Sequence, residues 1–114
     1  MPKVSVVMPA YNAEKYIGES IKSILNQTFI DFEFIIINDG SRDRTKEIIL
    51  SYSDDRIVYL ENEINSGIVV TLNKGLEYAT GEYIARMDAD DIAVAERLEK
   101  QIEFMEENKD VGVL

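Results

Sequence analysis

The feature that most constrains the fold is a regular alternation of short apolar runs with segments of helical periodicity. Four runs have the length and composition of strands, and they span residues 4–8, 32–37, 57–60 and 83–87. Between and after them, apolar residues recur at spacings of three and four, which is typical of one helix face. Apolar strands separated by helices predict a largely parallel sheet that is covered on both sides. We therefore expect an α/β fold with three layers.

The expected helices follow the strands in order. Asn12 can cap the first helix, and Ser41 or Asp43 can cap the second. The third and fourth helices each show one apolar face, formed by Val69, Leu72, Leu76 and Ala79 and by Val94, Leu98, Ile102 and Met105. A last apolar run begins at residue 111, and a natural domain seldom finishes on an unpaired strand. We therefore expect residues 1–114 to be one domain portion, truncated before its end.

Composition excludes several classes of chemistry. The chain has no cysteine and no histidine, so disulfides, thiolate or imidazole metal sites and Ser-His or Cys-His catalysis are excluded. A bound metal would need mainly oxygen ligands, which suits Mg²⁺, Mn²⁺ or Ca²⁺. The formal net charge of −10 would repel nucleic acid, and an anionic ligand would call for a bridging cation. No secretory signal and no membrane-spanning run is present, so we expect a cytoplasmic location.

Parallel sheets of this kind bind ligands outside the carboxyl ends of their strands. The segments that follow the four expected strands are polar or small, and three carry acids; they are residues 9–12, 38–41, 61–67 and 88–91. The sequence contains neither Gly-x-Gly-x-x-Gly nor Gly-x-x-x-x-Gly-Lys-Ser/Thr, so a dinucleotide-binding fold and a P-loop are not supported.

The sharpest of these segments is Asp88-Ala89-Asp90-Asp91. Three carboxylates within four residues repel one another unless a cation or hydrogen-bond donors compensate. Asp88 and Asp90 stand two apart in a segment expected to be extended, so they should project to one side and address one metal ion. The alternative is a helix N-terminus capped by Asp91, which explains one acid but not three. The apolar residues 92 and 93 disfavour an EF-hand, and the position after the fourth strand disfavours a haloacid dehalogenase-type phosphatase.

The other strand ends give weaker signals. Asp39 could accept a hydrogen bond from a base, or it could belong to a turn with local capping. Tyr11 offers a flat face for a base, and the alternative is a loop tyrosine packed on its own sheet. The N–H groups of residues 65–67 could face an anion at the start of the third helix. Lys74 could reach a phosphate or lie on a solvated face, and Arg86 could pair with one of the acids that follow it.

With these motifs in this order, the sequence resembles family 2 glycosyltransferases of the GT-A fold. The matching stretches cover essentially the whole chain, and they are VSVVMPAYN at 4–12, IINDGS at 36–41, NSG at 65–67, LNKG at 72–75, GEYIARMDADD at 81–91 and RLEKQ at 97–101. The resemblance implies a Rossmann-like GT-A sheet whose residues 1–114 bind a nucleoside-diphosphate sugar, with a UDP-sugar expected. It also implies transfer to a carbohydrate or lipid-linked acceptor in polysaccharide biosynthesis.

The resemblance assigns roles to individual residues. Tyr11 would lie against the base, Asp39 would bind its edge, and Asp88 would contact the ribose or the metal. Asp90 would ligate Mn²⁺ or Mg²⁺, which would bridge the diphosphate and assist its departure. The expected donor site is completed by Pro9, Ala10, Asn12, Gly67, Lys74 and Ala89.

Two departures and one missing part qualify the resemblance. Ala95 stands where many members have proline, and Leu72 where some have arginine. The family's catalytic base lies beyond residue 114, so we assign none, and we expect this chain alone to transfer no sugar. The full-length enzyme would invert the anomeric centre and could associate peripherally with the inner face of a membrane. The alternatives are a non-catalytic nucleotide-binding module and a signalling receiver domain, which needs an acid pair where this chain has residues 10–12.

Overall fold

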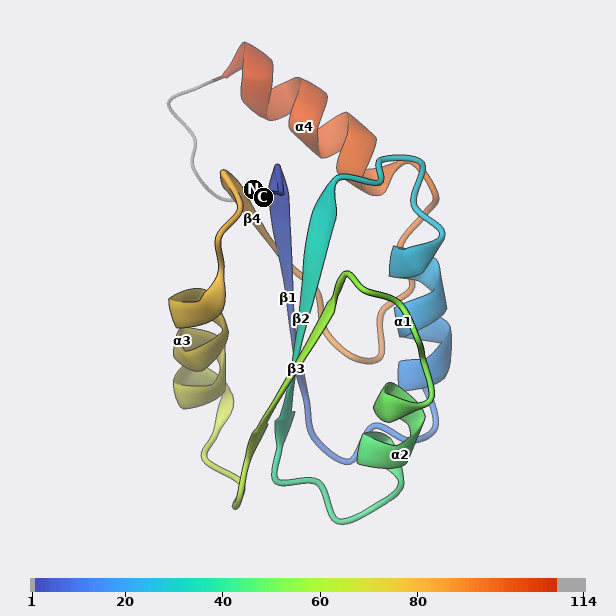
Figure 1. The fold of residues 1–114 in the computed structure, drawn as a ribbon, viewed down its shortest axis with the longest axis vertical. Helices are drawn as coiled ribbons and strands as arrows, with labels where there is room; N and C mark the ends of the chain where they lie inside the picture. The colour runs from blue at the N-terminus through green and yellow to red at the C-terminus, as the bar shows by residue number, and fades with distance from the viewer. Residues whose placement is uncertain (1, 109–114) are drawn as a thin grey trace.

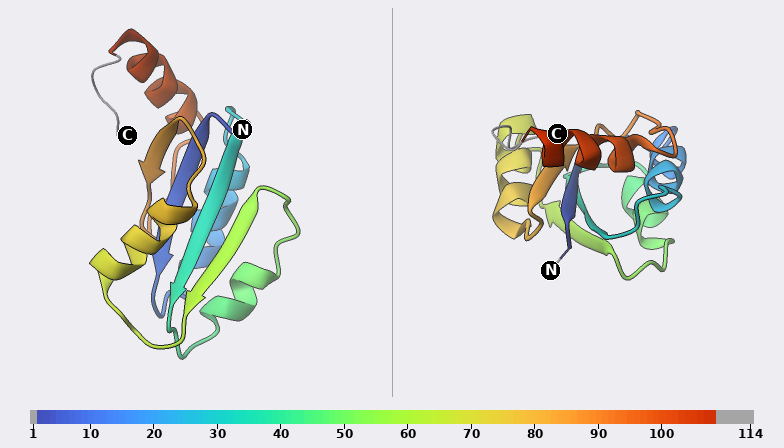
Figure 2. Two further views of the ribbon diagram at one scale, coloured as in Figure 1. Left: turned by 60° about the vertical axis from the view of Figure 1, so that its left-hand side comes forward. Right: turned by 90° about the horizontal axis from the view of Figure 1, so that it is seen from above.

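The computed structural model describes residues 2–108 (Figures 1 and 2). Strands and helices alternate as the sequence predicts, in the order β1 Val4–Ala10, α1 Ile17–Leu25, β2 Phe32–Asp39, α2 Thr45–Leu50, β3 Ile57–Asn62, α3 Ile68–Tyr78, β4 Tyr83–Arg86 and α4 Arg97–Glu107. The four strands form one sheet in the order β3-β2-β1-β4, and every neighbouring pair is parallel. In a receiver-type sheet β1 lies between β2 and β3, so this order argues against that alternative. The apolar run expected from residue 111 lies outside the described residues.

The sheet is the middle of three layers, as expected. Helices α1 and α2 cover one face and α3 covers the other (Figure 1). Side chains alternate between the two faces along each strand. Val6 and Phe34 belong to the larger core, with α1, whereas Val7 and Ile35 belong to the smaller core, on which α3 packs.

Helix α4 crosses the amino ends of the strands (Figure 1). Its buried residues Leu98, Ile102 and Met105 join the larger core, which confirms most of the predicted apolar face. Val94 was expected on the same face, but it is exposed and precedes the first residue of α4 by three positions. Within residues 2–108, no helix is both long enough and apolar enough to span a bilayer.

Pro9 does not end the sheet as its lack of an N–H group suggests. It lies inside β1 opposite Ile37, and the pairing with β2 continues to Ala10 opposite Asn38. Pro9 limits the pairing with β4 instead. The carbonyl oxygen of Val7 accepts a hydrogen bond from the N–H of Met87 at 3.0 Å. Because main-chain groups alternate sides along a strand, residue 9 would donate toward β4 next, and proline has no proton to give.

The face that α3 buries differs in part from the predicted one. Leu72 and Ala79 pack on the sheet as expected, but Val69 and Leu76 are exposed. The buried residues of α3 are Thr71 and Gly75. A Cβ atom at Gly75 would lie 2.6 Å from the Cγ1 atom of Val7, so the helix sits closer to the sheet than large side chains allow.

Candidate functional site

The carboxyl ends of β1, β2 and β4 meet at one edge of the sheet and enclose two adjoining pockets. The first has a volume of about 200 Å³, and its lining includes Pro9, Ala10, Tyr11, Asp39 and Gly67. The second has a volume of about 330 Å³, and its lining includes Pro9, Tyr11, Asn12, Ala89 and Asp90. Tyr11 lines both, and its side chain is half exposed. The fold therefore gathers predicted donor-site residues from four separate segments of the chain.

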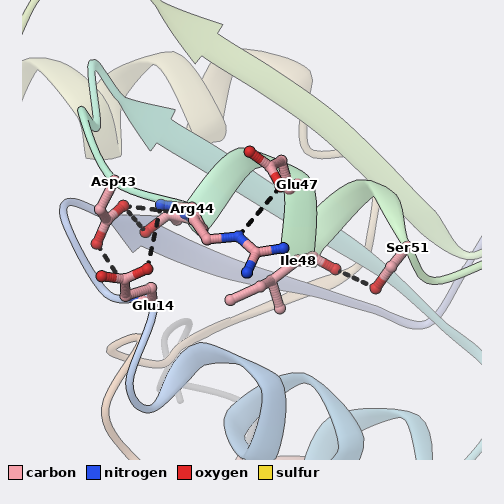
Figure 3. A network of polar contacts seen from close by, with 7 residues as sticks. Glu14, Asp43, Arg44, Glu47, Ile48 and Ser51 are labelled. Carbon is pink, nitrogen blue, oxygen red and sulfur yellow. Dashed lines mark hydrogen bonds and ion pairs between the residues drawn. The ribbon is translucent and has the colours of Figure 1, made fainter.

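The loops that follow β1 and β2 hold each other in place. The N–H group of Asn12 donates to Oγ of Ser41 at 2.9 Å, and Asn12 has a positive φ of 47°. The N–H group of Glu14 donates to Oδ2 of Asp43 at 3.2 Å, a contact that Figure 3 shows together with its neighbours. The prediction that Asn12 caps α1 is wrong, because α1 begins five residues later with Tyr16 in the capping position. Asn12 instead joins the two loops.

Asp39 is the most enclosed acid of this edge, with 4% of its surface exposed. Its Oδ1 atom accepts hydrogen bonds from Nδ2 of Asn62 at 2.8 Å and from the N–H of Ser66 at 2.8 Å. Its Oδ2 atom accepts one from the N–H of Gly67 at 3.1 Å. Burial alone would raise the pKa of Asp39, but these donors outweigh it and hold the pKa below its usual value. The anion that residues 66 and 67 face in this structure is therefore the Asp39 carboxylate.

Two further residues of this region, Gly40 and Lys74, support the loop that follows β3. Gly40 has a φ of +68°, and a Cβ atom there would lie 2.5 Å from the main-chain nitrogen of Asn65. Only glycine fits where the two loops approach so closely. Nζ of Lys74 donates to the carbonyl oxygen of Glu61 at 2.7 Å and to Oδ1 of Asn62 at 3.1 Å. Lys74 thus supports the loop after β3, and it lines neither of the two pockets.

The acidic segment after β4 forms a β-turn in place of the extended conformation that was predicted. The N–H of Asp91 donates to the carbonyl oxygen of Asp88 at 3.1 Å, while Met87 and Ala89 are buried beneath. Asp88, Asp90 and Asp91 are exposed, and one carboxylate oxygen of each lies within 4.8 Å of the others. The helix-capping alternative does not hold here, because α4 begins at Arg97 with Glu96 in the capping position.

Two arginines lie beside the acidic turn. Nη2 of Arg86 lies 3.3 Å from Oδ1 of Asp88, which confirms that Arg86 pairs with an acid. Nη2 of Arg97 donates to the carbonyl oxygen of Arg86 at 2.8 Å, and both arginines line a pocket of about 450 Å³ with Asp88 and Asp91. Sequence reasoning did not assign Arg97 to the site. Its place in the matched RLEKQ stretch was the only available signal.

Comparison with known proteins agrees with this architecture. The family model described as Glycosyl transferase family 2 matches residues 5–114. An uncharacterized glycosyltransferase of Methanocaldococcus jannaschii is 50% identical, and the match covers 99% of this chain and 40% of that protein. The UDP-Glc:alpha-D-GlcNAc-diphosphoundecaprenol beta-1,3-glucosyltransferase WfgD of Escherichia coli is 45% identical, with 92% and 42% covered. This chain thus spans about two fifths of the length of these relatives.

Solved structures show the same fold. TarS of S. aureus in complex with UDP superposes with a TM-score of 0.86 at 35% identity, over 92% of this chain and 32% of that one. The mannosyltransferase PcManGT of Pyrobaculum calidifontis, in complex with GDP-Man and Mn²⁺, gives 0.84 at 25% identity, over 91% and 32%. The parallel sheet, its helical layers and the family match over nearly the whole sequence agree, and the chain belongs to glycosyl transferase family 2.

Proposed function

We propose that this chain binds a nucleoside-diphosphate sugar, with a UDP-sugar as the donor, through a divalent cation held by Asp88 and Asp90. The observation that carries the proposal is the convergence of three exposed carboxylates beside the pockets that Tyr11 lines. Oxygen ligands grouped in this way suit Mn²⁺ or Mg²⁺. A bound cation would supply charge neutralisation for the diphosphate and help it to leave.

We assign different parts of the nucleotide sugar to different residues of the site. Tyr11 offers its ring to the base, and Asp39 offers the remaining acceptor capacity of Oδ2 to the edge of the base. Pro9, Ala10 and Gly67 shape the walls of that pocket, and Asn12 and Ala89 belong to the adjoining one. Asp88 reaches the ribose or the cation, and Lys74 would have to leave its present partners to reach a phosphate.

Local charge supports a role for a cation. Among residues 2–108, the pocket beside the acidic turn is lined by two arginines, Arg86 and Arg97, and Arg86 is already paired with Asp88. A diphosphate would add further negative charge to this edge of a chain whose formal net charge is −10. Like charges at short range disfavour binding unless a counter-charge is present.

The complexes and names of the relatives extend the proposal to the complete enzyme. TarS has been crystallised with UDP-GlcNAc and PcManGT with GDP-Man and Mn²⁺, and the name of WfgD states a UDP-Glc donor and a lipid-linked acceptor. We infer that residues 1–114 form the donor-binding part and that acceptor binding belongs to the additional length of such relatives. Direct attack by an acceptor hydroxyl would invert the anomeric centre, which NMR of the product would test.

Calorimetric titration with UDP tests the cation role. Affinity should be high with Mn²⁺ and fall in chelator, and Mn²⁺ should bind more tightly when UDP is present, because the coupling is reciprocal. Asp90→Asn should abolish the dependence on Mn²⁺. Asp55→Asn makes the same change of charge at an exposed position remote from this edge, and it should retain the dependence. Equal affinity of the unaltered chain with Mn²⁺ and in chelator would refute the proposal.

A further inference from the structure

The segment that joins β4 to α4 has no regular secondary structure, so its main-chain groups need partners from elsewhere. It includes the acidic turn and then runs alongside α1 to the start of α4 (Figure 1). Several of these partners come from one polar row of side chains on α1 and the turn that follows it. The row consists of Ser20 and Ser23 on α1 and Gln27 just after its end. Their spacing of three and four residues places side chains on one side of a helix.

Ser20 contacts the acidic turn itself. Its Oγ atom donates to the carbonyl oxygen of Ala89 at 2.7 Å and also lies within hydrogen-bond distance of the carbonyl oxygen of Asp91. These two carbonyl groups flank Asp90 on either side. Ser20 has no exposed surface, so water cannot take over these contacts without a rearrangement of the core.

Ser23 and Gln27 hold the rest of the segment. Oγ of Ser23 accepts a hydrogen bond from the N–H of Ala93 at 3.0 Å. Nε2 of Gln27 donates to the carbonyl oxygen of Val94 at 2.7 Å, and Oε1 of Gln27 accepts from the N–H of Leu98 at 2.9 Å. Leu98 lies in the first turn of α4, where main-chain N–H groups have no partner within the helix. Gln27, which is 3% exposed, therefore caps α4 although it lies 71 residues before Leu98 in the sequence.

We propose that Ser20 is a positioning residue for the cation site, with Ser23 and Gln27 supporting the same segment. The carboxylates of Asp88, Asp90 and Asp91 repel one another, and this repulsion favours opening of the turn. With its single proton shared between the carbonyl groups on both sides of Asp90, Ser20 opposes that opening and keeps the carboxylate oxygens at ligand spacing. The inference rests on the proposed cation role of Asp88 and Asp90. Loss of a residue that orients metal ligands typically lowers metal affinity by about 10- to 100-fold.

Binding of Mn²⁺ to the chain at a fixed concentration of UDP, followed by the EPR signal of free Mn²⁺, tests the inference. Ser20→Ala should raise the Kd for Mn²⁺ about tenfold, the lower end of the effect of losing such a partner. Ser5→Ala is the matched control. Ser5 is equally buried and contacts the N–H of Gly81 at 2.7 Å, at the opposite end of the sheet. Both variants should lose thermal stability, but only Ser20→Ala should lose Mn²⁺ affinity and show faster hydrogen exchange at the N–H of Asp91.

Each outcome decides between the two proposals. If Ser20→Ala binds Mn²⁺ as tightly as the unaltered chain, the positioning role is refuted and the cation site stands. The positioning role is also refuted if Ser5→Ala loses as much affinity as Ser20→Ala, because general destabilisation would then explain both losses. If the unaltered chain binds no Mn²⁺ with UDP present, the cation site is refuted and the positioning role with it. Should Ser20→Ala fail to fold, Ser23→Ala at a half-buried position must show a severalfold loss in the same assay.

Discussion

Replacement of Asp39 by asparagine probes the contact that ties the loop after β3 to the end of β2. The amide keeps the size of the carboxylate but removes its charge and one of its two acceptor atoms. If the amide oxygen keeps Asn62 and Ser66, its NH₂ group faces the N–H of Gly67, so two donors oppose each other. One charge-assisted hydrogen bond is lost and two become neutral, which together should cost about 2–4 kcal/mol of folding stability.

Urea unfolding at pH 7, followed by circular dichroism, measures this cost as a lower midpoint with an unchanged slope. Asp90→Asn is the control, because this exposed acid lies in a cluster of like charges and its neutralisation should leave stability unchanged or raise it. The pKa of Asp39 is lowered in the folded state, so its contribution is complete above the unfolded value of about 4. The contribution is lost as pH falls through the folded pKa of Asp39. The stabilities of the unaltered chain and of Asp39→Asn should therefore converge at that pH. An Asp39→Asn variant as stable as the unaltered chain at pH 7 would refute the anchoring role.

Three further outcomes are expected. Gly75→Ala should destabilise the fold by about 1–3 kcal/mol in urea unfolding, because the new methyl group would overlap Val7; no change would mean that α3 shifts freely. Tyr11→Ala should weaken UDP binding in calorimetry while leaving the melting temperature nearly unchanged, since the ring is half exposed; unaltered affinity would place the base elsewhere. Asp54, whose pKa is lowered to about 2 mainly by hydrogen bonding to Arg56, should contribute about 1 kcal/mol at neutral pH. Asp54→Asn should therefore be less stable than the unaltered chain at pH 7, and the difference should disappear as pH falls from about 4 to about 2.

The strands and the layers could be predicted from sequence because they depend on local composition. Apart from Glu33, the run at 32–37 is apolar on both faces, as a central strand requires, and it forms most of β2. The buried face of α3 could not be read in the same way. The spacing of Val69 and Leu76 indicates an apolar stripe, but the distance between helix and sheet decides which residues are covered. Thr71 and Gly75 are small enough for the close approach that the structure shows.

The meeting of the strand-end segments at one edge of the sheet was predictable, whereas the contacts between them were not. The carboxyl ends of parallel strands share one edge, so Tyr11, Asp39 and Asp90 were expected together and line adjoining pockets. The partners of Asp39 lie 23 to 28 residues later in the chain, and only the folded loop brings them to it. Ser20 lies about 70 residues from the turn it contacts, and a serine within an apolar helix carries no local signal of that role.

Asp39 is buried, whereas the three acids of the acidic turn are exposed, and this difference bears on how an anionic ligand could bind at this edge. Asp39 is enclosed, and the protein's own donors stabilise its charge, so its pocket can receive an uncharged base without an added ion. At the acidic turn, the hydroxyl group of Ser20 on α1 contacts main-chain oxygens of Ala89 and Asp91. The three carboxylates lie exposed at the surface, Asp88 beside Arg86, where a cation can reach them. Under the proposed binding mode, a nucleotide along this edge would place its base in the pocket of Asp39, whose charge the protein's own donors stabilise, and its diphosphate beside a turn where a cation supplies the counter-charge.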